Sequence, residues 1–494
     1  MRFAKILSVA SLPMFLFACS DSNGSGNFGN NPGAETPEEE KKDSIPENIL
    51  DEDLKPITRD YSTIWKNGDG SATDPYLISN EEELISLAFY VNDSSMTFKD
   101  KFFKLTADIA LTKAWKPIGV YGQNADGVGN RPFSGTFDGA SKTISGMTVS
   151  DTSAYTGLFG LARNAHISNV VIKGAKMNVG SIGGVLAGLA DTVTVENCSI
   201  ENAEIQGADH VGGLVGEAKY VTVSNVSVTG TVGGTNNVGG VLGSVQNGTL
   251  SNLTNKATVA GKSIVGGIVG ASSSVGNESS ISMVLNYGAV TGTKGDVGGV
   301  AAKISTTKIE QSGNYGAVTA GEDERGGAGG VVAVASSKSS MNEVFNTGAV
   351  TGTKLMAVGG VVGSLKAVKI TNIFNQGEVT STTSKLGGLV GIADADAVLE
   401  SGYNSGKVSD NNNSGMVAGK ANSLATMTNI YYDQTVAGTG LVIAEKMSSF
   451  VVPTGFTTEE MKAATFVATL NGSGAVWSID PAKFGGYPSF GWVK

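Results

Sequence analysis

The chain has 494 residues, with 45 acidic and 35 basic side chains and a formal net charge of -10. This acidic balance disfavours nucleic acid as a partner, and it disfavours anionic polysaccharide held by bulk charge. Glycine accounts for 69 residues and proline for only 11, without a three-residue period, which excludes collagen and low-complexity disorder.

Residues 1–18 predict a lipoprotein signal peptide. Arg2 and Lys5 precede an apolar run that is too short to span a bilayer as a permanent helix. The sequence Leu-Phe-Ala-Cys at residues 16–19 resembles a bacterial lipobox, which implies that Cys19 becomes the lipidated first residue. A secretory signal with a chance cysteine is the alternative. We expect lipid on Cys19 to be the membrane anchor, at the bacterial outer membrane or cell surface.

The next two segments predict a tether and a cap. Residues 19–56 are rich in Ser, Asn, Gly, Pro and Glu and almost free of apolar side chains, as in a disordered linker. Residues 57–149 concentrate aromatic side chains, and Asn80 with Glu83 gives a capping signal before a helical pattern. We interpret this second segment as an N-terminal cap that leads into the first coils.

A Gly-Gly pair followed by small aliphatic residues recurs through residues 150–430. A fixed period of this length is typical of a solenoid. We expect each pair to mark a tight bend that needs positive φ or a close backbone approach. A phosphate-binding loop is disfavoured, because no Lys-Ser or Lys-Thr follows. Counting on the second glycine gives ten units, 27 to 32 residues apart, at positions 157, 184, 213, 240, 267, 299, 330, 360, 388 and 415.

Within a unit, apolar residues recur at every second position, except at one fixed place where the step is three residues. Val221 and Val223 share one face of a strand, and the next apolar pair is Val226 and Val228. A corner between the pairs lets both face inward. Asn occupies the second corner position in five units, where it suits a left-handed backbone: Asn169, Asn197, Asn225, Asn252 and Asn372. A second Asn column predicts ladders of side-chain amides, with a row of ligand contacts as the alternative: Asn255, Asn286, Asn314, Asn346, Asn375 and Asn404.

The repeats resemble the GLUG-motif family of bacterial surface proteins. The nearest matches are Gly-Leu-Val-Gly at residues 213–216 and 388–391. The resemblance implies a right-handed parallel β-helix on a secreted or cell-surface protein, and it supplies no catalytic residues to transfer. Some members are attached to immunoglobulin-cleaving metallopeptidase modules, and this sequence contains no such module.

Residues 431–494 predict a C-terminal cap. Thr457 and Glu460 form a capping box before a second helical pattern, and Gly472 stands where a C-cap glycine is expected. The fold class is therefore all-β, a parallel β-helix of about ten coils with helix-containing caps at both ends.

Few residues in the repeats suggest chemistry. His166 and His210 have no metal-ligand spacing around them, and Cys198 occupies a position that other units fill with Val or Leu. The acids Glu217, Glu310, Glu343 and Glu378 are scattered without an evident column. We expect no catalytic residue, metal or cofactor.

The sequence favours a lipid-anchored cell-surface scaffold, non-enzymatic, that acts in adhesion or glycan binding. The expected partners are the membrane, through lipid on Cys19, and a glycan or another cell-surface ligand. We expect the contacts in the longer loops around residues 270–280, 291–297 and 320–328. The alternative is a carbohydrate-active β-helix enzyme, a polysaccharide lyase or hydrolase whose site is built from carboxylates.

Overall fold

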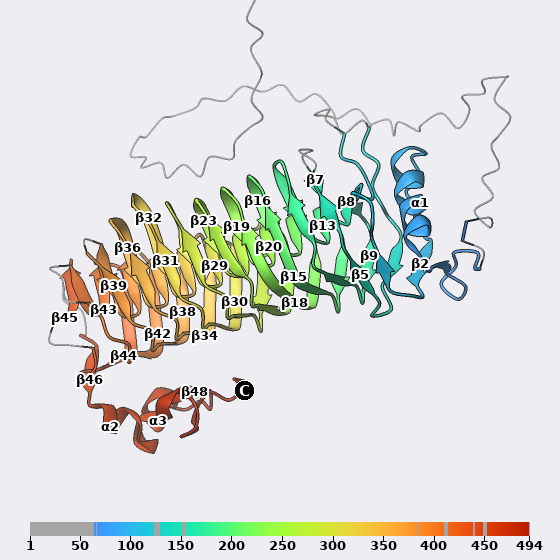
Figure 1. Cartoon of the computed structure of the whole chain (residues 1–494). Coiled ribbons are helices and arrows are strands. Elements are labelled where there is room, and N and C mark those ends of the chain that lie inside the picture. The colour runs from blue at the N-terminus through green and yellow to red at the C-terminus, as the bar shows by residue number, and fades with distance from the viewer. Residues whose placement is uncertain are drawn as a thin grey trace, which may run out of the picture. The chain divides into compact units, whose positions relative to one another are not determined.

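The computed structural model describes residues 64–493, apart from residues 66, 123–128, 151–154, 383, 410–412, 438–439 and 448–451. The predicted signal peptide, the predicted tether and Cys19 lie outside the described residues. The described part is a parallel β-solenoid of about thirteen turns, and its strands form one sheet of 26 strands and one of 20. Figure 1 shows the coils stacked along one direction, with helix α1 (Glu81–Asn92) at the N-terminal end of the stack.

Each turn adds one strand to a row of parallel partners in the larger sheet. This row is β1 (Tyr76–Ile78), β2 (Phe102–Leu105), β4 (Thr136–Asp138), β9 (His166–Ser168), β14 (Thr194–Glu196), β18 (Thr222–Gly233), β21 (Thr249–Asn255), β25 (Ser279–Ser282), β30 (Thr307–Asn314), β34 (Ser340–Asn346), β38 (Lys369–Asn375), β42 (Val398–Asn404), β44 (Thr426–Asp433) and β46 (Thr454–Phe456). The expected count of about ten coils is therefore too low. The Gly-Gly pair that we counted is missing from the first coils and from the last ones, although both stack on the same core.

The predicted corner is present in every unit for which it was expected. In β18 the chain bends at Asn225, so that Val223 and Val226 both point into the core and are at most 3% exposed. The five corner asparagines have φ between 52° and 55°, which is the left-handed region. An L-residue other than Asn or Gly adopts this region at a cost. The asparagines therefore allow one strand to turn without losing its inward pattern.

The Gly-Gly pairs lie in the smaller sheet and align from coil to coil. Their row is β7 (Tyr155–Thr156), β12 (Ile182–Gly184), β16 (Asp209–Gly212), β19 (Asn236–Gly239), β23 (Ser263–Gly266), β28 (Val297–Gly298), β32 (Asp323–Gly329), β36 (Leu355–Gly359), β40 (Lys385–Gly387) and β43 (Ser414–Ala421). Gly184 aligns with Gly212 and not with Gly213. We had counted Gly184 and Gly213 as equivalent positions, and this expected alignment is therefore wrong by one residue.

The second Asn column forms the predicted ladder inside the protein. Each amide nitrogen from Asn255 to Asn375 donates to the side-chain oxygen of the next asparagine at 2.8 to 2.9 Å, and all six asparagines of the column are 0% exposed. The alternative, a row of ligand contacts, is therefore wrong. The ladder also explains the second glycines, because a Cβ on Gly360 would lie 2.4 Å from Cγ of Asn375 and 2.1 Å from the carbonyl oxygen of Gly388. No positive φ is involved there, so close approach is the reason for glycine.

At the N-terminal end, α1 takes the place of strands in the first coil. Asn80 caps it by accepting a hydrogen bond from the backbone nitrogen of Glu83 at 3.0 Å. The predicted apolar face is buried, with Leu84, Leu87 and Val91 at 0% exposure. The helix thus covers the N-terminal end of the core in the described part of the chain.

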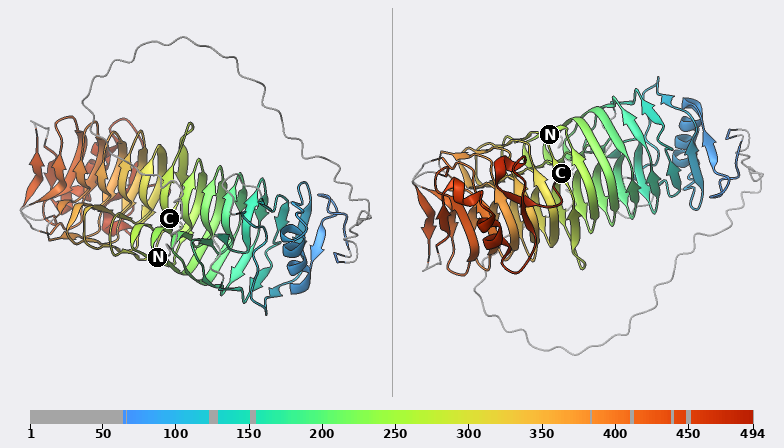
Figure 2. Two further views of the ribbon diagram at one scale, coloured as in Figure 1. Left: turned by 90° about the horizontal axis from the view of Figure 1, so that it is seen from above. Right: turned by 90° about the horizontal axis from the view of Figure 1, so that it is seen from below.

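The C-terminal segment, residues 457–493, packs against the side of the coils. It contains α2 (Thr458–Met461), α3 (Ala464–Asn471) and an antiparallel pair, β47 (Trp477–Ile479) and β48 (Pro488–Phe490), and the predicted Thr457–Glu460 capping box is formed. Its apolar side chains join an outward-facing stripe of the solenoid, Phe345, Phe374 and Tyr403, in a separate core. We had expected this segment to cap the end of the stack. Figures 1 and 2 show it instead alongside the last coils.

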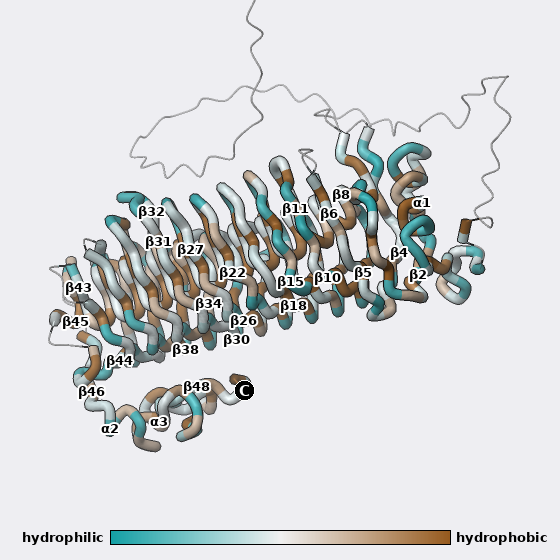
Figure 3. The backbone as a smooth tube through the Cα atoms, in the orientation of Figure 1, coloured by the Kyte–Doolittle hydropathy of each residue, from teal (hydrophilic) through white to brown (hydrophobic). Residues whose placement is uncertain are grey.

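Hydrophobic and hydrophilic residues alternate along the coils in Figure 3, as expected for strands with one face in a continuous core. None of the helices in the described part is long and apolar enough to cross a bilayer.

Candidate functional site

The two histidines lie on different sheets. Nε2 of His166, on β9, is 2.9 Å from Oε1 of Glu196 on the next coil. His210, on β16, has a φ of 44°, and its Nε2 lies 3.4 Å from the side-chain nitrogen of Asn237 on the following coil. The structure therefore does not bring the histidines together, and each is engaged with a neighbouring coil.

Cys198 is buried in the core, as its position in the repeat predicts. The side chain is 2% exposed, and Sγ lies 3.3 Å from the carbonyl oxygen of Glu196. Burial raises the pKa of the thiol to about 12. The sulfur therefore stays protonated and unreactive at physiological pH.

The scattered acids each have their own local partner. Glu217 pairs with Lys219 and Glu310 with Lys308, both at 2.8 Å, while Glu378 lies 3.8 Å from Lys407. Glu343 accepts hydrogen bonds from Gln311 and Asn342. In the described ranges, no three His, Cys, Asp or Glu side chains gather where they could share a metal ion.

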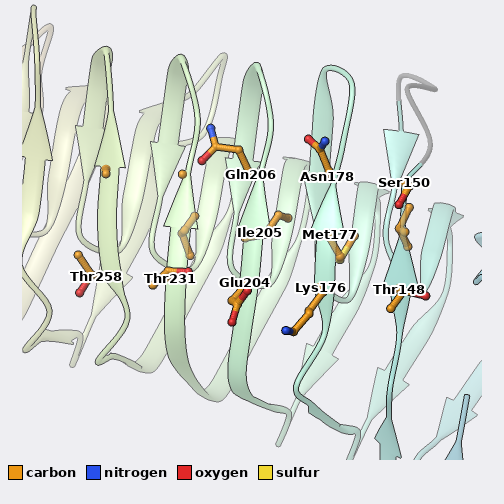
Figure 4. A pocket seen from close by; sticks show the side chains of 14 residues that line it. Thr148, Ser150, Lys176, Met177, Asn178, Glu204, Ile205, Gln206, Thr231 and Thr258 are labelled. Atoms are coloured by element: carbon orange, nitrogen blue, oxygen red, sulfur yellow. The ribbon is translucent and has the colours of Figure 1, made fainter.

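An open hollow of about 580 Å³ lies on one face of the N-terminal half of the solenoid. We call this face the polar face. It is formed by β6 (Thr148–Val149), β11 (Lys176–Asn178), β15 (Ser199–Gln206), the end of β18, and β22 (Thr258–Gly261). Figure 4 shows its side chains in rows that run from coil to coil.

The strand register explains these rows. On each of these strands one apolar side chain points into the core, for example Met177 on β11 and Ile205 on β15. The residues directly before these apolar side chains align as the first row, Thr148, Lys176, Glu204, Thr231 and Thr258. Residues directly after it align as the second row, Asn178, Gln206, Gly233 and Ala260. Because side chains alternate across a strand, both rows point outward while the residues between them are buried.

The hollow arises where the second row changes from large to small side chains. Asn178 and Gln206 stand on two coils, and Gly233 and Ala260 follow on the next two. The side chain of Gln206 occupies the space over Gly233, where a Cβ would lie 2.0 Å from its Oε1. The amide therefore forms one wall of a depression whose floor is backbone.

The polar face offers hydrogen-bonding groups that the protein does not use itself. The side chains of Lys176, Asn178, Glu204, Gln206 and Thr231 are exposed, and within the described ranges none makes a hydrogen bond or an ion pair. They supply an ammonium group, two carboxamides, a carboxylate and a hydroxyl, which together both donate and accept. This mixture suits a polyhydroxylated ligand.

Comparison with known proteins adds a similarity to solved structures at low sequence identity. No family model matches the chain, and no curated protein matches it. A solved structure from Bacteroides ovatus, provisionally named an immunoglobulin A1 protease, is 17% identical, with 87% of this chain and 96% of that chain covered, at a TM-score of 0.35. That score is too low for the similarity to carry an argument about function.

The polar face is a feature that the sequence analysis missed. The loops expected to make contacts, around residues 270–280, 291–297 and 320–328, do not line the hollow. The available signal was the drop from Gln206 to Gly233 and Ala260 at one repeat position. It becomes visible only when the strand register is known.

Proposed function

We propose that this chain is a lipid-anchored, non-enzymatic β-solenoid of the bacterial cell surface that binds glycan along its polar face. The observation that carries the proposal is the hollow with its unused donors and acceptors on successive coils. A glycan presents many hydroxyl groups, each able to donate and accept, so a rigid row of amides, hydroxyls and charged groups complements it.

The anchoring half of the proposal rests on the N-terminal sequence. The lipobox ending at Cys19 and the polar tether after it suit a folded domain held away from a membrane. The Gly-Leu-Val-Gly repeats support membership of the GLUG-motif family, whose proteins lie at bacterial surfaces.

The charge pattern favours binding over catalysis. Glycoside hydrolysis requires two carboxyl groups that flank one bond. Among the residues that line the hollow, Glu204 is the one carboxylate, while Glu217, Glu310 and Glu400 are each paired with a lysine of the same or a neighbouring coil. A polysaccharide lyase or hydrolase remains the competing proposal, and it requires carboxylates that converge.

A glycan array followed by titration calorimetry tests the proposal. The double variant Lys176→Ala/Gln206→Ala removes two contact groups from the polar face, and we expect affinity for the best glycan to fall about tenfold. The matched control is Lys173→Ala/Glu201→Ala, which changes one neighbouring pair on the same two coils outside the hollow. Equal affinity of both variants and the unmodified protein would contradict the polar face as the binding surface.

A further inference from the structure

A second hollow, about 550 Å³, lies between the side of the coils and the C-terminal segment. Four successive coils supply Tyr315, Thr347, Gln376 and Ser405. The C-terminal segment supplies Lys483, Phe484, Gly485 and Tyr487. The four coil residues each follow an asparagine of the internal ladder, so they occupy one register position. The hollow therefore follows the stacking direction, with one side chain per coil.

Aromatic rings occupy one end of this row. The rings of Tyr287 and Tyr315, on adjacent coils, are stacked at 4.7 Å between centroids with an angle of 3° between their planes. Tyr287 is 44% exposed although its ring is large and apolar. Tyr315 is held in place on its other side by the edge-on ring of Phe345, 5.2 Å away. The two rings thus face each other along the stack, and Nζ of Lys256 lies 5.9 Å from the centroid of the Tyr287 ring. The edges of the pair form a rigid aromatic surface that reaches solvent beside the hollow.

Polar groups follow the rings along the same row. Nε2 of Gln376 donates to the carbonyl oxygen of Phe484 at 3.0 Å, which fixes the amide and leaves its oxygen to accept. The hydroxyls of Thr347 and Ser405 make only long contacts of 3.5 Å with backbone carbonyls. The hollow therefore combines an apolar surface with fixed donors and acceptors, which is the usual composition of a small-molecule site.

Lys483, the charged residue that lines the hollow, has its charge compensated. Nζ of Lys483 donates to the carbonyl oxygen of Val493 at 3.1 Å and lies 3.8 Å from the carboxylate of Asp480. Burial raises the pKa of the Tyr315 hydroxyl to about 12, so this group is neutral at physiological pH. A neutral ligand is favoured, because an ionic one would have to compete with an existing pair.

The spacing of the row favours an extended chain of sugars. Parallel strands repeat at about 4.8 Å, which is close to the length of one pyranose unit in an extended oligosaccharide. A pyranose has an apolar C–H face that packs on an aromatic ring and a rim of hydroxyls that hydrogen-bond. We infer that this hollow, the aromatic groove, binds a neutral oligosaccharide along the stack, with one sugar against the exposed edges of the Tyr287–Tyr315 pair and the next sugars over Thr347 and Gln376. This inference rests on the proposed glycan-binding function.

Titration calorimetry with β-1,4-linked hexasaccharides of glucose, mannose and xylose tests the aromatic groove. With the hexasaccharide that binds best, we expect Tyr287→Ala and Tyr315→Ala each to weaken binding at least about tenfold, since a central aromatic contact is worth more than 1.4 kcal/mol. Thr347→Val, which removes one hydroxyl at constant size, is expected to weaken binding about threefold to tenfold. Tyr220→Asn is the control, because Tyr220 is 59% exposed outside the groove and its φ of 52° suits Asn.

The outcomes separate the two proposals. Loss of binding in the Tyr287, Tyr315 and Thr347 variants, with Tyr220→Asn unchanged and all variants folded by circular dichroism, supports the groove. Binding that all three groove variants retain overturns the groove and leaves the polar face as the site. If no glycan binds even the unmodified protein, on the array or as a hexasaccharide, the inference fails together with the proposed function.

Discussion

Individual asparagine and glycine residues determine how closely the coils stack. The amide of Asn346 accepts from Asn314, donates to Asn375 and donates to the carbonyl oxygen of Gly348, at 2.8 Å in each case. Its hydrogen-bonding capacity is thereby used within the protein, at 0% exposure. The glycine of the facing sheet has to be small because this amide occupies the space that a side chain would need.

Gly360→Ala is expected to destabilise the solenoid by about 2 kcal/mol or more, because the new methyl group overlaps both the Asn375 amide and the Gly388 carbonyl. Urea unfolding followed by circular dichroism measures the effect. Gly440→Ala is the matched control, since a Cβ there meets no atom within 4 Å. A Gly360→Ala midpoint equal to that of the control would contradict the close-approach explanation.

Glu445 supplies a pH-dependent contact near the end of the stack. Hydrogen bonds from Lys385 and Lys420, at 2.6 and 2.7 Å, lower the pKa of its carboxyl from 4.5 to about 2. Since the folded pKa is the lower one, the stabilisation is complete above about pH 4.5 and is lost as the pH falls toward 2. The side chain is 41% exposed, so salt screens the effect.

We therefore expect Glu445→Gln to increase hydrogen exchange of strand β45 (Leu441–Lys446) at pH 6 relative to the unmodified protein, and the difference to shrink near pH 2. Mass spectrometry of peptides that cover β45 measures it at each pH. A difference that persists at pH 2 would assign the effect to packing and not to ionisation.

Among the structural elements, the C-terminal segment is joined to the coils by one buried carboxylate as well as by its apolar core. Oδ2 of Asp433 accepts from the hydroxyls of Tyr487 at 2.6 Å and Thr458 at 2.7 Å, and Oδ1 accepts from the backbone nitrogens of Thr435 and Val436. Burial, together with the hydrogen bond to this carboxylate, raises the pKa of Tyr487 well above its usual range. Asp433 thus ties the last coil to two separate points of the segment.

Asp433→Ala is expected to release the C-terminal segment while the coils stay folded. The loss leaves the buried hydroxyl of Tyr487 without an acceptor, at about 1 to 3 kcal/mol, and removes the acceptor of the partly buried Thr458 hydroxyl as well. Because Trp477 is 3% exposed in the packed segment, its release should shift tryptophan fluorescence to longer wavelength at constant circular dichroism. Tyr487→Phe, which removes one of the bonds, should show a smaller shift. Unchanged fluorescence in Asp433→Ala would contradict this role.

The comparison of sequence and structure shows which signals are local. The corner at Asn225, the helix N-cap at Asn80 and the capping box at Thr457 depend on a few neighbouring residues, and all were predicted correctly. The side-on packing of the C-terminal segment was missed, because it depends on Phe374 and its neighbours pointing outward at one register position. The polar face was missed for the same reason, since its rows join residues of different coils.

At the scale of the whole molecule, the two surfaces that we propose as ligand sites lie on one stack of coils. The polar face spans the first coils that carry the repeats, and the aromatic groove follows later coils beside the C-terminal segment. A stack of coils with a shared core keeps each row straight, so a chain-like ligand meets equivalent groups at regular intervals. This arrangement suits recognition of an extended polymer.

Cys19→Ser is expected to move the protein from the membrane fraction to the soluble fraction of the cell, because the thiol that accepts the lipid is lost. Fractionation and metabolic labelling with a radioactive fatty acid measure both effects. Cys198→Ser is the control, which should keep the label. Labelling of Cys19→Ser would contradict lipid attachment at this residue.

The central claim is that the solenoid binds glycan without cleaving it. The most direct measurement incubates the purified protein with a polysaccharide panel, with and without Ca²⁺, and follows both retention of protein on the polysaccharide and release of fragments. The account predicts retention on at least one polysaccharide, with neither new reducing ends nor unsaturated ends. Fragments that accumulate with time, or failure to be retained on any polysaccharide, would contradict it.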